Sequence, residues 1–409
     1  MPGPGYAFLG AEEQANVEQV LQSWDLTRYA YDVPDKTSFV RGLELAAQEI
    51  FGAPYCIAVN SGTSALLTGL AALGVGPGDE VIVPGYTFIA SIGSIVHSGA
   101  TPVLAEVDAS LTLDPRDVEE RITPRTRAIM AVHMLGAPCD MDALRAIADR
   151  HELALLEDTA QACGAGYRGD RLGTIGRLGA FSLNPFKVIT SGEGGLLLTG
   201  DSHLYQRAYA FQDQGWSVLR ADRDNTGGDI LFGLNLRMSE LTAAVGSAQL
   251  AKLDTVLDSV RATKQRLVGL IPELPGLQRR ILHDPAGECG TLLVYQLPTA
   301  TAAAELAATL GTRTLVESGR HYYGNMPQLA GLSDGSSIPF HGRARTDVPD
   351  YRVGSLPLTD DILARSVAVS VGVSDSYLGA GFGVTVRSTA TEIESAAEQF
   401  TRAAEKVLG

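Results

Sequence analysis

One lysine in this 409-residue chain stands in a setting that could activate it. Lys187, one of only five lysines, lies among apolar residues in Ser182-Leu-Asn-Pro-Phe-Lys-Val-Ile and precedes the glycine-rich Gly192-Glu-Gly-Gly195. A lysine held out of water loses proton affinity, and its neutral amine can condense with an aldehyde. The glycines would let the backbone approach a flat ligand closely. The alternative is that Lys187 is solvated, as most lysines are.

Residues 60–66, Asn-Ser-Gly-Thr-Ser-Ala-Leu, follow an apolar strand-like run and open a helix-like one. Free N–H groups at the start of a helix bind anions, and Gly62 would permit a close approach. The hydroxyls of Thr63 and Ser64 stand beside it. The pattern predicts a phosphate site, with an ordinary helix cap as the alternative.

Asp158 and Gln161 follow another apolar run, Leu153-Ala-Leu-Leu-Glu157. A buried aspartate there could hold the protonated nitrogen of a pyridine ring, and Gln161 could reach a hydroxyl of that ring. Asp158 could equally be the cap of the helix that follows.

Two further segments carry candidate contacts. Pro84-Gly-Tyr-Thr-Phe88 places aromatic rings after a strand, either to stack on a flat heterocycle or to pack in the core. The run from Gly233 to Glu240 begins a long helix, which Asn235 or Ser239 could merely cap. Together, a phosphate cradle, a stacking ring, a partner for a pyridine nitrogen and an amine for a Schiff base meet the needs of a pyridoxal phosphate site.

A regular alternation of strands and helices positions these segments. Short β-rich apolar runs predict seven strands, at 55–59, 80–83, 102–105, 127–133, 153–157, 178–182 and 195–199. Helical periodicity predicts helices at 63–73, 87–98, 115–121 and 141–150, a long helical region at 237–270 and a surface helix at 298–310. The alternation predicts an α/β fold with a mainly parallel sheet covered on both faces, whose ligands lie beyond the carboxyl ends of the strands.

The length of the chain predicts two lobes, because a single hydrophobic core stops growing near ~250–300 residues. We expect a large domain at 36–250 and a smaller C-terminal α/β domain at 251–409. The N-terminal segment, 1–35, is expected to pack near the active site.

Composition excludes several other classes of function. A net charge of −15 without a basic patch argues against a nucleic-acid partner. No apolar stretch approaches the ~20 residues that span a bilayer, and the start lacks the features of a secretory signal. We therefore expect a cytoplasmic protein without membrane contact. The four cysteines and seven histidines lack metal-ligand spacing, so neither a metal site nor a disulfide framework is expected.

The chain resembles the DegT/DnrJ/StrS family of sugar aminotransferases, which are pyridoxal phosphate enzymes of fold type I. The resemblance runs from about Phe8 to Leu253. It rests on SGTSAL at 61–66, PGYTF at 84–88, EDTAQACGA at 157–165, the lysine five residues after Ser182 with SGEGG, and GLNLRMSELTAAVGSAQL at 233–250. It implies the fold type I architecture, with a seven-stranded sheet in the large domain.

The resemblance also implies the residues that hold the phosphate group. Gly62, Thr63 and Ser182 would bind it, with Ser64 beside them. The family places the asparagine that matches Asn235 in the phosphate site of the neighbouring subunit, so an obligate homodimer is implied.

The chemical roles implied by the resemblance fall on four residues. Phe88 would stack on the cofactor ring, Asp158 would bind the ring nitrogen, and Gln161 would meet the ring hydroxyl. Lys187 would bond covalently to the cofactor aldehyde, and its freed amine would then move the proton of the amino donor.

The implied reaction moves an amino group from glutamate or glutamine to a keto- or aldehydo-sugar, with pyridoxamine phosphate as the intermediate form of the cofactor. The acceptor would be a nucleotide-linked sugar, an octose or a cyclitol, in the synthesis of an antibiotic or of cell-surface sugars. Arg28 and the cluster His321, Tyr322, Tyr323 and Asn325 could contact the acceptor, although the cluster could also be a polar surface turn. His133 could be a core histidine and is left out of the catalytic set.

Two other functions stay open. One branch of the family removes a hydroxyl from a deoxysugar and has histidine at the position of the lysine, so Lys187 argues against that branch. A noncatalytic regulator that keeps the fold is the second alternative, because a fold does not establish activity. Departures from the family pattern at Leu183, at Thr159-Ala160 and at 374–383 put the identity of the substrate in doubt more than the type of reaction.

Overall fold

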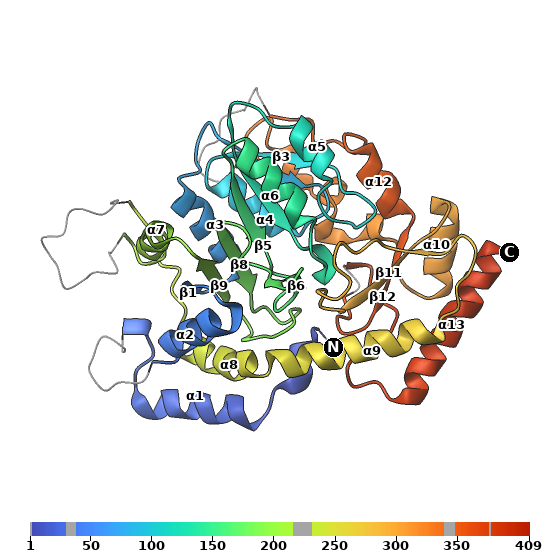
Figure 1. The fold of residues 1–409 in the computed structure, drawn as a ribbon, viewed down its shortest axis with the longest axis horizontal. Coiled ribbons are helices and arrows are strands. Elements are labelled where there is room, and N and C mark those ends of the chain that lie inside the picture. The colour runs from blue at the N-terminus through green and yellow to red at the C-terminus, as the bar shows by residue number, and fades with distance from the viewer. Residues whose placement is uncertain (1, 30–37, 216–230, 339–347, 376–377) are drawn as a thin grey trace, which may run out of the picture.

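A seven-stranded sheet forms the centre of the molecule (Figure 1). The computed structural model describes residues 2–29, 38–215, 231–338, 348–375 and 378–409. The strand order is β1-β9-β8-β5-β4-β2-β3, and β9 alone runs antiparallel to its neighbours in this sheet. The strands are β1 (Tyr55–Val59), β2 (Glu80–Pro84), β3 (Thr101–Ala105), β4 (Thr126–Val132), β5 (Ala154–Asp158), β8 (Leu178–Ser182) and β9 (Gly195–Thr199). The predicted mainly parallel α/β sheet is confirmed.

Each of these strands lies within one residue of its predicted bounds, because each is apolar on both faces and ends at a polar residue or a turn. In β1, Cys56 and Ala58 belong to the core under one face, and Ile57 and Val59 to the core under the other. The sheet is therefore buried on both sides, as predicted.

Helices cover the two faces of the sheet. The helices α3 (Gly62–Leu73), α4 (Ile89–His97) and α7 (Ser202–Gln212) pack on one face. The helices α2 (Phe39–Phe51), α5 (Pro115–Glu120), α6 (Met141–Arg150) and α8 (Glu240–Ala251) pack on the other. The region expected to be helical at 237–270 is two helices, because the backbone turns at Lys252 (φ −97°, ψ 1°) before α9 (Leu253–Leu270) begins.

A smaller antiparallel sheet lies at the far end of α9. It contains β10 (Gln278–Arg279), β11 (Leu292–Gln296) and β12 (Ser366–Ser370). Two helices pack beside it, α10 (Ala300–Thr309) and α13 (Ala390–Leu408). In Figure 1, α8 and α9 follow one another below the large sheet, and α9 continues as far as α13. The residue limits predicted for the two lobes remain a prediction.

The N-terminal segment lies against the backbone that follows Lys187. It consists of a short 3₁₀ helix, η1 (Pro4–Phe8), and α1 (Ala11–Ser23). A Cβ atom at Gly5 would come within 2.8 Å of the Ile189 Cα atom, so the two backbones are in direct contact. Lys252 anchors the segment by donating to the Phe8 carbonyl at 2.9 Å and to Glu13 Oε1 at 2.8 Å. Among the described residues, no helix is long and apolar enough to cross a membrane.

Candidate active site

The predicted cofactor residues other than Asn235 lie at one edge of the large sheet. Because β1, β2, β5 and β8 are parallel, their carboxyl ends lie on the same side. The antiparallel β9 begins at that edge, where Gly195 pairs with Val59. Residues 60–64, 85–88, 158–161 and 182–195 are thereby gathered from four separate parts of the chain.

The start of α3 combines a helix cap with a close backbone approach. Ser61 is the cap, because its Oγ accepts from the Ser64 amide at 3.1 Å. The Ser64 hydroxyl donates to Asn60 Oδ1 at 2.6 Å, while Thr63 is exposed. A Cβ atom at Gly62 would lie 2.6 Å from the Ser182 Cβ atom, so the end of β8 touches the helix start. The expected helix cap is therefore present at α3, made by Ser61, and the anion site at the same helix start stays a prediction.

Replacing Gly62 with alanine should weaken the binding of a phosphate-bearing cofactor at least ~10-fold, because the new methyl group forces Ser182 away from the helix start. Equilibrium dialysis against pyridoxal phosphate measures the effect. The matched control is Gly93→Ala in α4, where an added Cβ meets no atom within 4 Å. Equal affinities for the two variants would contradict the assignment of this cradle.

Asp158 is held rigidly at the end of β5. Its Oδ2 accepts from the Ser91 hydroxyl at 2.7 Å, and its Oδ1 accepts from the Ala160 amide at 3.0 Å. Ser91 in turn contacts the Thr87 hydroxyl at 2.7 Å. The carboxylate is buried. Such a fixed, desolvated charge can hold a cationic ring nitrogen. No helix follows β5, because residues 159–165 form turns that lead into β6 (Gly166–Tyr167), so the alternative that Asp158 caps a following helix is wrong.

Gln161 is oriented by a neighbouring loop. Its Oε1 accepts from the Leu135 amide at 2.8 Å, which leaves its amide nitrogen to serve as the donor. Leu135 has a left-handed backbone (φ 58°), a conformation that is rare for a branched side chain and needs support from its surroundings.

Lys187 is half-buried in the loop between β8 and β9. Burial lowers the pKa of Lys187, and the charges of Asp158 and Asp375 partly offset this effect. Its Nζ lies 6.0 Å from the centre of the Phe88 ring. The amine of Lys187 is therefore close enough to Asp158 to feel its charge and lies near the Phe88 ring, and its role as a reactive amine stays a prediction.

Two of the three glycines after Lys187, Gly194 and Gly195, pack tightly against other parts of the protein, whereas an added Cβ at Gly192 would meet no atom within 4 Å. A Cβ atom at Gly195 would collide with the Ser61 carbonyl oxygen. Gly194 has φ 151°, and a Cβ atom there would lie 3.0 Å from the Met238 Cε atom. This tight packing at Gly194 and Gly195 fixes the loop that carries Lys187, and the approach of a flat ligand to the glycines stays a prediction.

A small cavity beside Lys187 lies where the smaller sheet meets the large one. It is lined by Leu135, Gln161, Phe186, Lys187, Val188, Thr291, Leu292, His321, Val373, Asp375 and Leu378. His321 also packs on Phe88, with ring centroids 5.2 Å apart. Of the residues predicted to contact an acceptor, His321 is therefore next to Lys187.

Tyr322 and Tyr323 are not part of a surface turn, because both are buried. Their hydroxyls donate to Asp360 at 2.8 Å and 3.1 Å. The Tyr323 amide also donates to the Gly85 carbonyl at 3.0 Å. The surface-turn alternative is therefore wrong for Tyr322 and Tyr323, which hold their segment against the end of β2. Their contact with an acceptor stays a prediction. Asn325 likewise donates to the backbone, to the Val316 carbonyl at 2.8 Å.

Arg28 is likewise buried and held by contacts within the protein. It is 1% exposed, and its guanidinium donates to Glu44 Oε1 at 2.9 Å and to the Ala58 carbonyl at 3.3 Å. These contacts tie the N-terminal region to α2 and β1. A contact between Arg28 and substrate stays only a prediction.

Asn235 lies on the surface rather than in the cluster. It is exposed and forms an isolated bridge with Asp213. Ser239 is the cap of α8, because its Oγ accepts from the Thr242 amide at 3.2 Å. The capping alternative is therefore correct for Ser239 and not for Asn235.

Glu157 and His133 support the site from beneath. Glu157 is fully buried and accepts from three amides, those of Gly173, Ile175 and Gly176. His133 Nε2 lies 3.1 Å from Glu157 Oε2. The interpretation of His133 as a satisfied core histidine is confirmed.

Three residues that the sequence did not single out also belong to the site. Ser91 binds Asp158, Leu135 orients Gln161, and Asp375 lines the cavity beside Lys187. Ser91 lies three residues after Phe88, one helical turn into the predicted helix, and this spacing was the available signal. Asp375 falls in the unusual 374–383 segment, of which residues 376–377 lie outside the described part of the chain.

The chain is similar to known proteins both in sequence and in fold. The sequence model of the DegT/DnrJ/EryC1/StrS aminotransferase family matches residues 8–367. L-glutamine:2-deoxy-scyllo-inosose aminotransferase of Micromonospora echinospora is 37% identical over 353 residues, which are 82% of this chain and 81% of that protein. dTDP-3-amino-3,4,6-trideoxy-alpha-D-glucose transaminase of Streptomyces venezuelae is 40% identical over 279 residues, which are 66% of this chain and 68% of that protein.

One solved structure is similar to this chain over almost its whole length. The X-ray structure of DesV from S. venezuelae superimposes with a TM-score of 0.78 at 30% identity, and the match covers 99% of each chain.

Proposed function

The chain belongs to the DegT/DnrJ/EryC1/StrS aminotransferase family, and from this premise we propose its cofactor and its substrates. The cofactor is pyridoxal phosphate, with pyridoxamine phosphate as its aminated form. The amino donor is glutamate or glutamine. The acceptor is a keto- or aldehydo-group on a nucleotide-linked sugar, an octose or a cyclitol.

The described residues fit this cofactor. The phosphate suits the start of α3, where Gly62 and Ser182 touch and leave backbone N–H groups at the surface. The ring would lie between Phe88 and the carboxylate of Asp158, which Ser91 and the Ala160 amide hold in place. When bound, the cofactor supplies an aldehyde for the amino group and a protonated ring that takes up carbanion charge.

The desolvated amine of Lys187, facing Asp158 and Phe88, is the observation that carries the proposal. Because burial lowers its pKa, Lys187 holds a larger neutral fraction than a solvated lysine and can act as a nucleophile. The same amine would take the proton from the donor α-carbon and return it to the C4′ carbon of the cofactor, on the other side of the transferred nitrogen. Asp158 keeps a proton on the ring nitrogen throughout, while Phe88 and His321 keep water from one side of the site.

The choice of acceptor follows from the relatives' names. One of them acts on the ketone of a cyclitol with glutamine, and another makes an amino sugar carried on a nucleotide. His321 and Asp375 line the cavity next to Lys187, and they are the polar residues that we propose for the acceptor.

We propose a homodimer in which Asn235 enters the phosphate site of the second copy. Asn235 is exposed beside Phe232, whose side chain is fully exposed, and Leu234, which is 49% exposed. Trp24 is also exposed. Three residues after it in the chain, Thr27 forms a bridge with Ser239, which lies close to Asn235 in the sequence. Large apolar side chains on the surface are typical of an interface.

The proposal is tested in two half-reactions. The cofactor-loaded protein is mixed with L-glutamine or L-glutamate alone, and the 2-oxo acid released is measured together with the change in cofactor absorbance. A keto-sugar or keto-cyclitol is then added with a ¹⁵N-labelled donor, and ¹⁵N is expected in the product. Release of no 2-oxo acid from either donor would support a regulator, and loss of a hydroxyl without ¹⁵N would support a dehydratase.

A further inference from the structure

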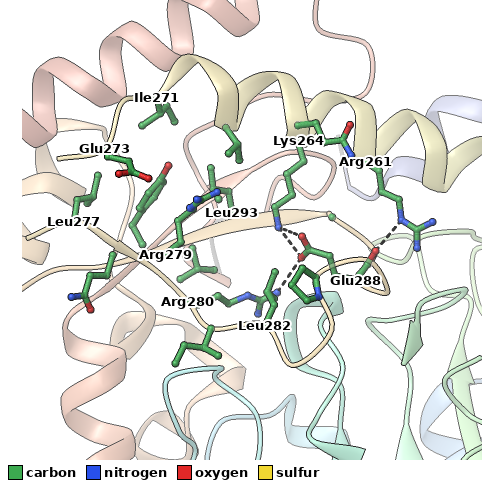
Figure 2. A pocket seen from close by; sticks show the side chains of 18 of the residues that line it. Arg261, Lys264, Ile271, Glu273, Leu277, Arg279, Arg280, Leu282, Glu288 and Leu293 are labelled. Atoms are coloured by element: carbon green, nitrogen blue, oxygen red, sulfur yellow. Dashed lines mark hydrogen bonds and ion pairs between the residues drawn. The ribbon is translucent and has the colours of Figure 1, made fainter. Parts of the chain in front are cut away.

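A second cavity, about 990 Å³ in volume, lies beneath α9 in the smaller lobe (Figure 2). Its walls come from α9, from the segment that leads into β10, from the loop before β11 and from β11 itself. We call it the α9 groove. Its charged lining residues are Arg261, Lys264, Glu273, Arg279, Arg280 and Glu288.

Two buried cations share one carboxylate at the inner wall of the groove. Lys264 is 9% exposed, and its Nζ donates to the two Glu288 oxygens at 2.6 Å and 2.7 Å. Arg280 is 5% exposed, and its Nη2 lies 3.8 Å from Glu288 Oε2. Figure 2 shows Lys264 and Arg280 converging on Glu288 from opposite sides. Burial lowers the pKa of Lys264 to about 8, and Glu288 offsets only part of this effect.

The lining of the α9 groove carries more positive than negative charge. Arg261 and Arg279 add two more cations to its walls, and Glu273 adds one acid. The four basic groups outnumber the two acidic ones, although the chain as a whole carries a net charge of −15. An anion entering the groove would be attracted by charges that the protein itself leaves uncompensated.

Arg280 also holds the loop that orients Gln161. Its Nη1 donates to the Met134 carbonyl at 3.2 Å and its Nη2 to the Leu135 carbonyl at 3.0 Å. Its buried Nε has no hydrogen-bond partner among the described residues, so this donor is unsatisfied. The Leu135 amide donates to Gln161 on the other side of the same loop. One peptide segment thus connects the wall of the groove to the predicted ring contact.

We propose that the α9 groove binds a phosphate ester carried on an apolar body, and that Arg280 couples its binding to the position of Gln161. A doubly charged headgroup matches the excess of cations, and Val268, Ile271 and Leu293 supply apolar wall for the body. The volume is in the range of pockets that enclose a small organic molecule. The coupling half of the inference rests on the proposed function, and the binding half does not.

The binding half is tested with 4-nitrophenyl phosphate as the probe. Its dissociation constant is measured by ligand-observed NMR on protein loaded with pyridoxal phosphate, so that the phosphate site at α3 is filled. Arg279→Met, which changes an exposed wall residue, should weaken binding at least ~10-fold. Arg266→Met is the matched control: it removes the same charge from α9, outside the groove, where Arg266 pairs with Glu394. The proposal would be overturned if the probe bound the wild type and Arg279→Met with equal affinity, or if it did not bind at all. If inorganic phosphate bound as tightly as the ester, the inference that the ligand carries an apolar body would be overturned.

The coupling half is tested by the affinity and the absorbance maximum of bound pyridoxal phosphate, with and without the probe. Saturation with the probe should change the cofactor dissociation constant at least ~5-fold in the wild type. Arg280→Met should lose this change, and Arg280→Lys, which keeps the charge, should keep part of it. No change in the wild type would overturn the coupling. Failure of the protein to bind cofactor would count against the proposed function instead, because binding of the probe can still be measured on the cofactor-free protein.

Discussion

Replacing Lys187 with alanine should lower the rate of amino transfer by at least ~10³-fold, because one side chain supplies both the nucleophile and the proton carrier. The structure contains no second lysine in the lining of the cavity beside it, within the residues described. The variant should still bind the cofactor through the start of α3 and Asp158. Stopped-flow absorbance after mixing with the amino donor measures the loss directly.

Two further measurements separate the chemistry of Lys187 from its packing. Borohydride reduction should attach the cofactor covalently to the peptide that contains Lys187 in the wild type, and should leave it removable in the alanine variant. Added methylamine should restore part of the proton transfer in that variant, because a small amine can enter the vacated space. Lys406→Ala, at an exposed position on α13, is the control and should behave as the wild type. Wild-type rates in Lys187→Ala would contradict the whole assignment.

The sheet that carries the site could be predicted because its strands have a strong local pattern. The strand β5, for example, is a short apolar run that ends in charged residues, and both of its faces are buried. A strand of this kind needs no knowledge of its neighbours to be recognised. Asp158 was predicted as a site residue for the same reason, since a carboxylate at the end of such a strand lies at the ligand edge of an α/β sheet.

Contacts between distant parts of the chain could not be predicted in the same way. Ser91 and Asp158 are 67 residues apart, and only the parallel pairing of the sheet brings their hydroxyl and carboxylate to 2.7 Å. Tyr322 and Tyr323 have the composition of a polar surface turn, but Asp360 binds both hydroxyls and draws the pair inside. Arg28 has the residue type of a substrate contact, but Glu44 pairs with it in the core. A single polar side chain does not reveal whether its partner is a ligand or another part of the protein.

These contacts show which residues hold the site in position. Residues proposed to touch the cofactor lie at the ends of the strands or just after them, and internal hydrogen bonds hold some of them: Ser91 holds Asp158, and the Leu135 amide holds Gln161. A loop with such internal partners keeps its geometry when substrate arrives, and this preorganisation lowers the cost of reaching the transition state. Changes to the supporting groups should therefore lower the rate by displacing the reacting groups, and their effects should be smaller than those of changes to the reacting groups themselves.

Replacing Asp158 with asparagine should lower the rate of amino transfer ~10²-fold, the second largest effect that we expect. This variant tests the difference between reacting and supporting groups. An amide carries no negative charge, and loss of a paired charge lowers the pKa of a cationic partner by about 1–3 units, so the ring nitrogen would lose its proton at neutral pH. The absorbance of the bound cofactor should shift accordingly, and this shift reports the change without any turnover. Ser91→Ala is the matched variant: it removes one hydrogen bond to the carboxylate and keeps the charge, so it should cost no more than ~10-fold. If Asp158→Asn and Ser91→Ala were equally slow, or if neither changed the absorbance, the carboxylate would act only as a structural group and the ring nitrogen would need another partner.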